Sequence, residues 1–256
     1  MSITYVPAEE AMARPGLRMV VVGGIPSPWS EAAKGILHVK QIPWTAVRLA
    51  YDNPALFEWT GQKNAPVAIH DNERPRSGWA DILLLAERLA PTPALLPRDA
   101  AERALVFGLT HELVGEQGLA WTRRLQLIEA GLAGTGGFAP KVAAYLGKRY
   151  GHDPQAGAAA SRRVIELLGM MSARLKAQHS AGSDYYVGDG LTAVDIYSAA
   201  ALALLRPLPH DVCAMDAVTR TAFEYREAAT DAALDEVLLR HRDMMYQRHL
   251  ALPLSL

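Results

Sequence analysis

The segment from residue 17 to residue 40 constrains the fold more than any other part of the sequence. Met19–Val22 is a short, wholly apolar run, and a turn rich in glycine and proline follows it. After this turn, apolar residues recur at helical spacing from Ser30 onward. A strand without any polar residue is typical of a strand that is buried on both faces. The chain must therefore supply further elements that cover both sides of the sheet.

Two more strand-like runs and one helix follow within the same unit. Trp44–Leu49 is rich in aromatic and β-branched residues, and residues 65–71 form a similar run that opens at a proline. Trp79–Leu89 has the continuous apolar character of a helix. We therefore expect a small α/β unit over residues 17–90, preceded by an irregular extension over residues 1–16.

The character of the sequence changes after a proline-rich stretch that we interpret as a linker over residues 91–100. Strand signals stop there, and only helical patterns follow. Helical segments are predicted near residues 101–118, 119–131, 138–150, 157–180, 192–206, 215–229 and 232–248. We therefore expect an α/β domain followed by an all-helical domain over residues 101–256.

Composition and charge exclude several function classes. The formal net charge is −1, so no basic surface is expected for nucleic acid or an anionic membrane. No run of apolar residues is long enough to predict a membrane span, and the first residues lack the apolar core of a signal peptide. Cys213 is the only cysteine, which excludes an intramolecular disulfide and favours a reducing, cytoplasmic compartment. His210 and Asp211 lie near it, but a metal site needs more ligands, so we expect no metal.

The tetrapeptide Ser27-Pro28-Trp29-Ser30 has the spacing of the C-x-x-C redox motif with both sulfurs replaced by hydroxyls. A hydroxyl cannot exchange disulfides, but at a helix N-terminus it can donate a hydrogen bond to the thiolate of a bound molecule. Ser27 is the first candidate for this donor and Ser30 the second. The alternative is structural: Ser27 followed by proline is also a good helix cap, and Ser30 could cap a helix that starts at Glu31.

Three motifs, taken in chain order, resemble the cytosolic glutathione transferase family. They are the strand–turn–helix with SPWSEAAK, the proline-opened strand NAPVAIHD, and the segment YYVGDGLTAVDIYSAAAL in the helical half. The last motif contains Thr192 and Asp195 at the spacing of a capping box, in which each side chain satisfies a backbone N–H of the other residue. The family pattern around this box also includes Tyr186, Gly188 and Leu191. The resemblance covers nearly the whole chain from residue 17 and implies a thioredoxin-like domain followed by an all-helical domain.

The resemblance also implies a glutathione site. Ser27 matches the position of the catalytic serine or cysteine, and Ala65 matches the residue whose backbone contacts glutathione, next to a cis bond to Pro66. The family has an acidic residue and a serine at the start of the next helix, whereas this chain has Arg76 and Ser77 at that position. Asp81, one turn further on, is an alternative partner for the ammonium group of glutathione. We expect Arg76 and Ser77 to bind a carboxylate of glutathione.

Two functions follow from this resemblance. The first is an enzyme that conjugates glutathione with, or exchanges it onto, a small electrophile, a detoxification reaction. The second is a non-catalytic binding or scaffolding protein of the same fold, which the missing acid favours. The family resemblance further implies a homodimer. In the helical half, we expect ordinary core or solvent-facing side chains at His111, Glu112, Trp121, Arg123 and Arg124. We expect His241 and His249, near the end of a charged helix, to face solvent.

Overall fold

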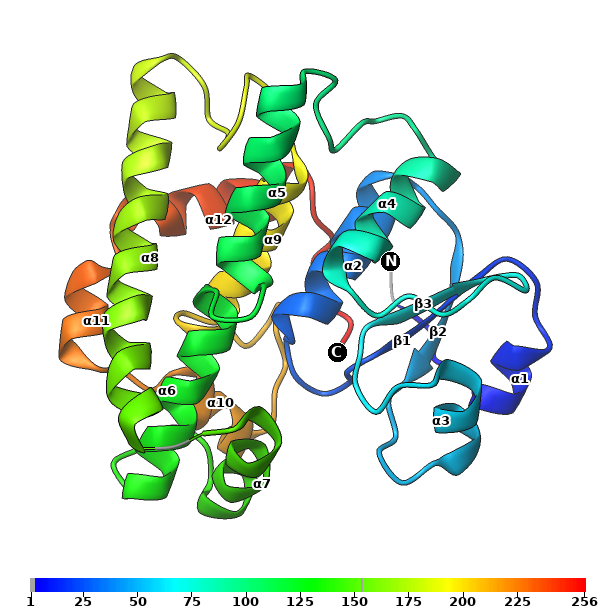
Figure 1. The fold of residues 1–256 in the computed structure, drawn as a ribbon, viewed down its shortest axis with the longest axis horizontal. Coiled ribbons are helices and arrows are strands. Elements are labelled where there is room, and N and C mark those ends of the chain that lie inside the picture. Colours follow the sequence, from blue (N-terminus) through cyan, green and yellow to red (C-terminus); the bar gives the residue numbers. More distant parts are fainter. Residues whose placement is uncertain (1–2, 153) are drawn as a thin grey trace.

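The computed structural model describes residues 3–152 and 154–256, and it divides into a small sheet domain and a larger helical domain (Figure 1). Strand β1 (Leu17–Val21) lies in the middle of a three-stranded sheet of order β2-β1-β3. Strand β2 (Trp44–Arg48) runs parallel to β1, and β3 (Val67–His70) runs antiparallel to it. The predicted architecture, an α/β domain followed by an all-helical domain, is confirmed.

Every residue of β1 is buried, because helices cover both faces of the sheet. Met19 and Val21 point into the core cluster that contains residues of α2 (Pro28–Val39) and α4 (Trp79–Leu89). Val20 belongs to a second cluster on the opposite face, against α1 (Ala8–Met12) and α3 (Pro54–Thr60). The side chains of β1 are therefore buried on both faces of the sheet, as the apolar composition of the strand predicts.

The N-terminal segment differs from the irregular extension that we expected over residues 1–16. It contains α1, whose Ala8 and Ala11 are buried, and the Val6 N–H bonds the Ala46 carbonyl of β2 over 2.9 Å. A five-residue helix is too short to produce a helical periodicity in the sequence. The role of its two buried alanines is seen only in the structure, where they pack against the second face of the sheet.

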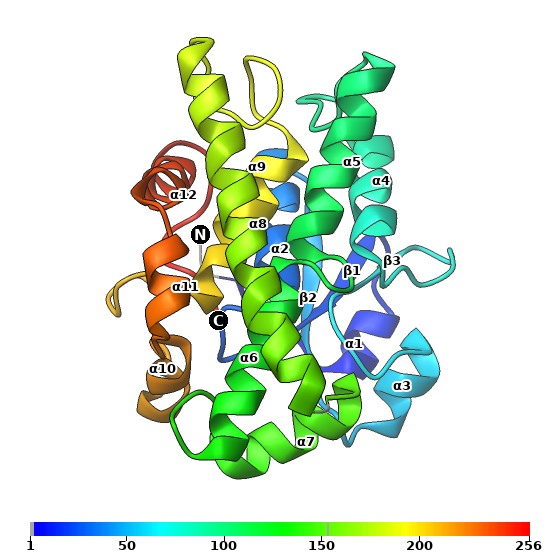
Figure 2. The same cartoon turned by 60° about the vertical axis from the view of Figure 1, so that its left-hand side comes forward.

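The helical domain surrounds α9 (Ala193–Ala201), all of whose residues are buried. Helix α9 packs against α2 of the sheet domain and against α5 and α12, so it joins the two domains. The 3-10 turn η1 (Leu202–Leu204) continues it. The other helices of this domain are α5 (Ala100–Val114), α6 (Leu119–Ala133), α7 (Pro140–Tyr150), α8 (Pro154–Ser180), α10 (Ala217–Phe223), α11 (Ala228–Ala233) and α12 (Glu236–Arg248). Helices α10, α11 and α12 follow one another along one edge of the domain (Figure 2).

The single helix predicted over residues 215–229 is two helices, α10 and α11. Each begins at its own acidic cap. The Asp216 carboxylate accepts from the N–H groups of Val218 and Thr219, and the Glu227 carboxylate accepts from those of Ala229 and Thr230. A side-chain cap at Glu227 starts a new helix and interrupts the old one.

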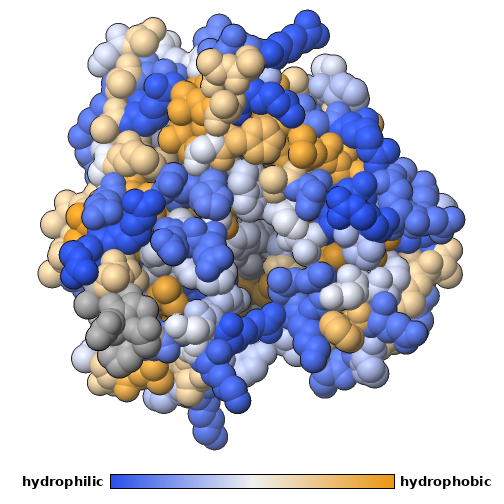
Figure 3. Space-filling model, viewed as in Figure 1, coloured by the Kyte–Doolittle hydropathy of each residue, from blue (hydrophilic) through white to orange (hydrophobic). Residues whose placement is uncertain are grey.

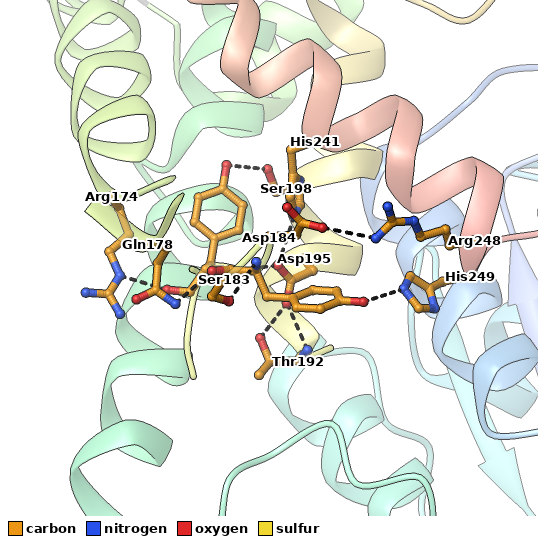
Figure 4. A network of polar contacts seen from close by, with 12 residues as sticks. Arg174, Gln178, Ser183, Asp184, Thr192, Asp195, Ser198, His241, Arg248 and His249 are labelled. Atoms are coloured by element: carbon orange, nitrogen blue, oxygen red, sulfur yellow. Dashed lines mark hydrogen bonds and ion pairs between the residues drawn. The ribbon is translucent and has the colours of Figure 1, made fainter. Parts of the chain in front are cut away.

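The predicted capping box of α9 is present and is the centre of a buried polar network (Figure 4). Asp195 has no solvent exposure, and its carboxylate accepts from the Thr192 N–H over 2.8 Å and from the Tyr186 N–H over 3.0 Å. The same carboxylate lies 3.0 Å from Nε2 of His241, whose side chain is also fully buried.

Our expectation that His241 and His249 face solvent is therefore wrong. His241 lies on the face of α12 that also buries Val237, Leu238 and Met245, and Asp195 supplies its polar partner there. His249 is partly buried, and its Nε2 lies 2.9 Å from the Tyr185 hydroxyl. The charged residues around these histidines in the sequence had suggested an exposed helix, but the buried partners lie in a distant segment.

The two ends of the chain meet beside α2 (Figure 1). The Ser255 carbonyl accepts from Nζ of Lys34 over 2.8 Å and from the Tyr5 hydroxyl over 3.2 Å, and the Ile3 N–H bonds the Ser255 hydroxyl over 3.1 Å. These contacts hold the C-terminal tail against the sheet domain. Within the described part of the chain, no helix is both long enough and apolar enough to cross a membrane.

Candidate functional site

A cavity of about 600 Å³ lies between the two domains. The sheet domain lines it with the start of α2, the turn before β3 and the start of α4. The helical domain lines it with the end of α5, with α6 and α7, and with part of α10. In the space-filling view, the molecule is hollowed near its middle, between the two domains (Figure 3).

Ser27 is the N-cap residue of α2 and lines this cavity. Its backbone is extended, Pro28 takes the first helical position, and its carbonyl accepts from the Glu31 N–H over 2.8 Å. Its side chain, however, makes no capping hydrogen bond. The hydroxyl therefore lies at the positive end of the helix without being used by it, which disfavours the purely structural explanation of this serine.

Ser30 has a different environment. It is completely buried, and its Oγ accepts from the Val22 N–H over 3.1 Å. It is not among the residues that line the cavity. Its hydroxyl ties the residue after β1 to the first turn of α2, which is a structural role.

The other candidate glutathione-binding residues divide into two groups. Ala65 and Pro66 line the cavity, and the bond between them is cis, as the resemblance implies. Ser77 and Gly78 also line it, at the start of α4, where Gly78 is the N-cap residue and provides no side-chain cap. Backbone N–H groups of this helix start are thus available to an anionic group in the cavity.

Arg76 does not line the cavity. Its backbone forms an isolated antiparallel bridge to Ala68, with N···O distances of 2.8 and 2.9 Å, which holds this residue at the edge of the sheet. Its Nη2 donates to the Glu73 carboxylate over 2.6 Å. Hydrogen bonds from Arg88 and then Arg76 lower the pKa of Glu73 to about 2. The structure thus directs the Arg76 side chain into an ion pair at the surface of the sheet domain.

The helical domain contributes an arginine that sequence reasoning had assigned to ordinary core or surface. The guanidinium carbon of Arg124 lies 4.3 Å from the ring centroid of Trp29 and 4.7 Å from that of Tyr150. Trp29 is itself held by a 2.7 Å hydrogen bond from its indole N–H to the Val114 carbonyl. Trp121 and Arg124 are three residues apart and hence on one face of α6, a spacing that could have indicated a shared environment.

Arg149, which also lines the cavity, connects the two domains. Its Nη2 donates to the Lys63 carbonyl over 2.6 Å and its Nη1 to the Tyr145 hydroxyl over 3.2 Å. Its guanidinium also lies 5.5 Å from the ring centroid of Tyr51. These contacts place three groups of the sheet domain and the helical domain around one cation.

Cys213 and its neighbours offer no second reactive centre. The thiol is buried, and burial raises its pKa to about 11. A protonated thiol is neither a nucleophile nor a good metal ligand. Among the described residues, no group of three or more histidine, cysteine, aspartate or glutamate side chains is arranged to hold a metal ion.

Comparison with known proteins agrees with this architecture. Residues 138–222 match the family model described as glutathione S-transferase, C-terminal domain. A search of curated proteins finds no significant match.

Three solved structures illustrate the similarity of the fold. A glutathione S-transferase from Methylobacterium radiotolerans, in complex with glutathione sulfonate, is 18% identical, with a TM-score of 0.61 and coverage of 91% of each chain. One from Methylobacillus flagellatus with glutathione bound is 14% identical, with a TM-score of 0.62 over 91% of this chain and 95% of that one. A Tau class enzyme from mango, Mangifera indica, is 20% identical, with a TM-score of 0.58 over 92% of this chain and 90% of that one.

These observations define the class of protein: the chain has the glutathione S-transferase fold, with a thioredoxin-like domain followed by an all-helical domain. Within this fold, residues 138–222 match the family model of the C-terminal domain of glutathione S-transferases.

Proposed function

We propose that this protein is a glutathione transferase in which Ser27 donates a hydrogen bond to the thiolate of bound glutathione. The observation that carries this proposal is that Ser27 lines the cavity at the N-terminus of α2 and that its hydroxyl makes no capping bond. The proposal is supported by two solved structures of this fold that contain glutathione or glutathione sulfonate.

The chemistry requires an ionised sulfur. A free thiol has a pKa of about 8.5, so only a few per cent is ionised at neutral pH. A hydrogen bond to a charged group contributes about 1.5–3 kcal/mol, enough to move that pKa by a unit or more. The thiolate then attacks the electrophilic carbon, a carbon–sulfur bond forms, and the leaving group departs with its electron pair.

The remaining glutathione contacts are assigned from the cavity lining. The Ala65 backbone takes the cysteinyl part beside Pro66, and Ser77 with the α4 N-terminus takes a carboxylate. The binding of a glutathione carboxylate by Arg76 stays a prediction, because Arg76 would have to leave its ion pair with Glu73 to reach such a group.

Substitution of Ser27 tests the proposal. Ser27→Ala should lower the rate of glutathione conjugation about 10- to 150-fold, since one charge-assisted hydrogen bond is lost. Glutathione affinity, measured by calorimetry, should change little, and so should the melting temperature, because the hydroxyl makes no cap.

Ser30→Ala is the matched control. It removes the acceptor of the Val22 N–H, so it should lower the melting temperature and leave turnover per folded enzyme nearly unchanged. An unchanged conjugation rate in Ser27→Ala would remove Ser27 from the mechanism.

A second candidate function is a non-catalytic binding protein of the same fold. The start of α4 favours it, because no acidic side chain there lines the cavity among the described residues to take the glutathione ammonium. Glutathione binding without conjugation of any electrophile in a broad panel would support this function. A wild-type protein that conjugates a simple aryl halide would exclude it.

We also propose a homodimer, with the sheet domain of one subunit against the helical domain of the other. Leu84 of α4 and Leu105 of α5 are exposed, and apolar surface lies over these two helices in the space-filling view (Figure 3).

Detoxification in the cytoplasm is the physiological role that accompanies the proposed reaction.

A further inference from the structure

We propose that the electrophile accepted by this cavity is a small apolar molecule that carries one carboxylate, and that Arg124 binds the carboxylate. This inference rests on the proposed function, because it names the class of second substrate for the same site.

Arg124 is held in place by aromatic rings. Its guanidinium carbon lies 4.3 Å from the centroid of the Trp29 ring and 4.7 Å from that of Tyr150. The Tyr150 ring is packed in turn against Trp121, with centroids 5.0 Å apart. Such contacts attract a cation and limit its orientation, so the group is preorganised.

The hydrogen-bonding capacity of Arg124 is unused. Within residues 3–152 and 154–256, its guanidinium makes no hydrogen bond and no ion pair, although it has five N–H donors. The neighbouring Arg123 shows the contrast: it is buried, and it donates to the Leu204 carbonyl over 2.9 Å and to the Tyr225 carbonyl over 2.5 Å. Arg123 is a structural residue of the core, whereas the donors of Arg124 remain available to a ligand.

The charge of the cavity favours an anion. Arg149, the second cation of the cavity lining, is engaged by a backbone carbonyl and a tyrosine hydroxyl, one bond from each terminal nitrogen. Glu116, which is exposed, is the only carboxylate among the described residues that line the cavity. Burial lowers the pKa of Arg124, yet an arginine stays protonated at physiological pH. A desolvated cation without a counter-ion raises the local concentration of anions and strengthens their binding.

Arg124 and Ser27 line the same cavity. Trp29, which packs against the guanidinium, is two residues after Ser27 on the same helix start. The surrounding wall is apolar and aromatic, which suits the hydrocarbon part of the substrate. Side chains that form this wall include Trp121, Phe138, Val142, Leu146 and Phe223.

A pair of aryl chlorides makes the inference testable. In 4-chloro-3-nitrobenzoate the glutathione thiolate attacks the carbon that bears chlorine, a carbon–sulfur bond forms with the sulfur electron pair, and chloride leaves with the electrons of the carbon–chlorine bond. The neutral partner, 4-chloro-3-nitrobenzamide, reacts in the same way but lacks the anion. Rates divided by the uncatalysed rates compare the two substrates directly.

In the wild type, kcat/KM for the benzoate should exceed that for the benzamide after this correction. Arg124→Gln should lower the benzoate value roughly 10- to 100-fold and the benzamide value less than about threefold. Arg124→Lys keeps the charge and should lose part of the preference, because an ammonium lacks the planar fork. Equal effects of Arg124→Gln on both substrates would overturn the inference.

Arg103→Gln is the matched control. Arg103 also lies over an aromatic ring, 5.3 Å from the centroid of Phe107, but it does not line the cavity. It should leave the preference for the benzoate unchanged. If Arg124→Gln does not fold, competition in the wild type decides. Unsubstituted benzoate must then inhibit the turnover of 4-chloro-3-nitrobenzamide at least tenfold more strongly than unsubstituted benzamide does. Equal inhibition by the two compounds would overturn the inference.

Direct binding separates this inference from the proposed function. Quenching of tryptophan fluorescence by 3-nitrobenzoate and by 3-nitrobenzamide needs no glutathione and no reaction. Arg124-dependent binding of the anion in a protein that conjugates nothing would support the anion site and contradict the transferase function. Conjugation of both aryl chlorides, with neither binding nor rate depending on Arg124, would support the function and contradict the site.

Discussion

Glu31 is a carboxylic acid buried in α2, four residues after the cavity-lining Ser27. Its Oε1 lies 2.7 Å from Nζ of Lys34, and the side chains of both residues are buried. Burial raises the pKa of Glu31 to about 7, and the attraction of Lys34 opposes this rise. The folded chain therefore holds this proton more tightly than the unfolded chain does.

This proton makes the stability of the protein depend on pH. Because the folded state binds the proton up to about pH 7 and the unfolded state only up to about pH 4.5, the free energy of unfolding should fall as pH rises through this window. The fall attributable to Glu31 is about 3 kcal/mol. Above pH 7 it should level off.

Glu31→Gln should remove this part of the slope, because glutamine does not ionise. Denaturant unfolding at pH 5 and pH 7.5 measures the change in the free energy of unfolding with pH in the wild type and in the variant. Glu10→Gln, which changes an exposed carboxylate, is the control and should keep the slope. A wild-type slope that survives in Glu31→Gln would show that Glu31 is ionised throughout.

At the scale of elements, the packing of α6 against the following loop depends on one glycine. A Cβ added at Gly131 of α6 would lie 2.1 Å from the Phe138 carbonyl oxygen, which is far inside van der Waals contact. The backbone of the loop therefore reaches the helix only where a side chain is missing. This approach positions Phe138, which lines the cavity.

Gly131→Ala should destabilise the protein by about 1–3 kcal/mol or more, since backbone must move to admit the methyl group. Gly108→Ala is the matched control, because that glycine lies inside α5 with nothing within 4 Å of the added Cβ. It should stabilise by about 0.5–1 kcal/mol through helix propensity. Melting temperatures of the two variants check both signs, and a neutral Gly131→Ala would show that the loop moves freely.

At the scale of the whole molecule, two domains meet along α2 and α9, and the cavity lies between them. Trp29 and Arg149 each bond a carbonyl of the other domain, which holds the walls of the cavity at a fixed separation. The C-terminal tail packs against the sheet domain through its contacts with Lys34 and Tyr5.

The proposed homodimer is a prediction at this scale. Light scattering at micromolar concentration should give twice the chain mass of 27.8 kDa. Replacing Leu84 and Leu105 with aspartate should shift the mass toward that of one chain, because charge replaces apolar surface at the proposed interface. A wild-type mass of 27.8 kDa would contradict the dimer.

The sequence by itself determined the three strands, most of the helices and their order, because these depend on neighbours in the chain. The apolar run of β1 predicted a strand covered on both faces, and the spacing of Thr192 and Asp195 predicted the capping box of α9. The resemblance carried by such motifs was sufficient for the fold. It was also sufficient to name Ser27 and Ala65, which line the cavity.

Only the tertiary structure decided which polar side chains face the cavity, because their partners are distant in the sequence. The backbone bridge between Arg76 and Ala68 places the Arg76 side chain next to Glu73. His241 is buried because Asp195, on another helix, supplies its polar partner. Arg124 resembled any arginine of an amphipathic helix until the fold brought Trp29 and Tyr150 to its two sides. A local sequence pattern does not predict such contacts, because they form only when distant segments pack together.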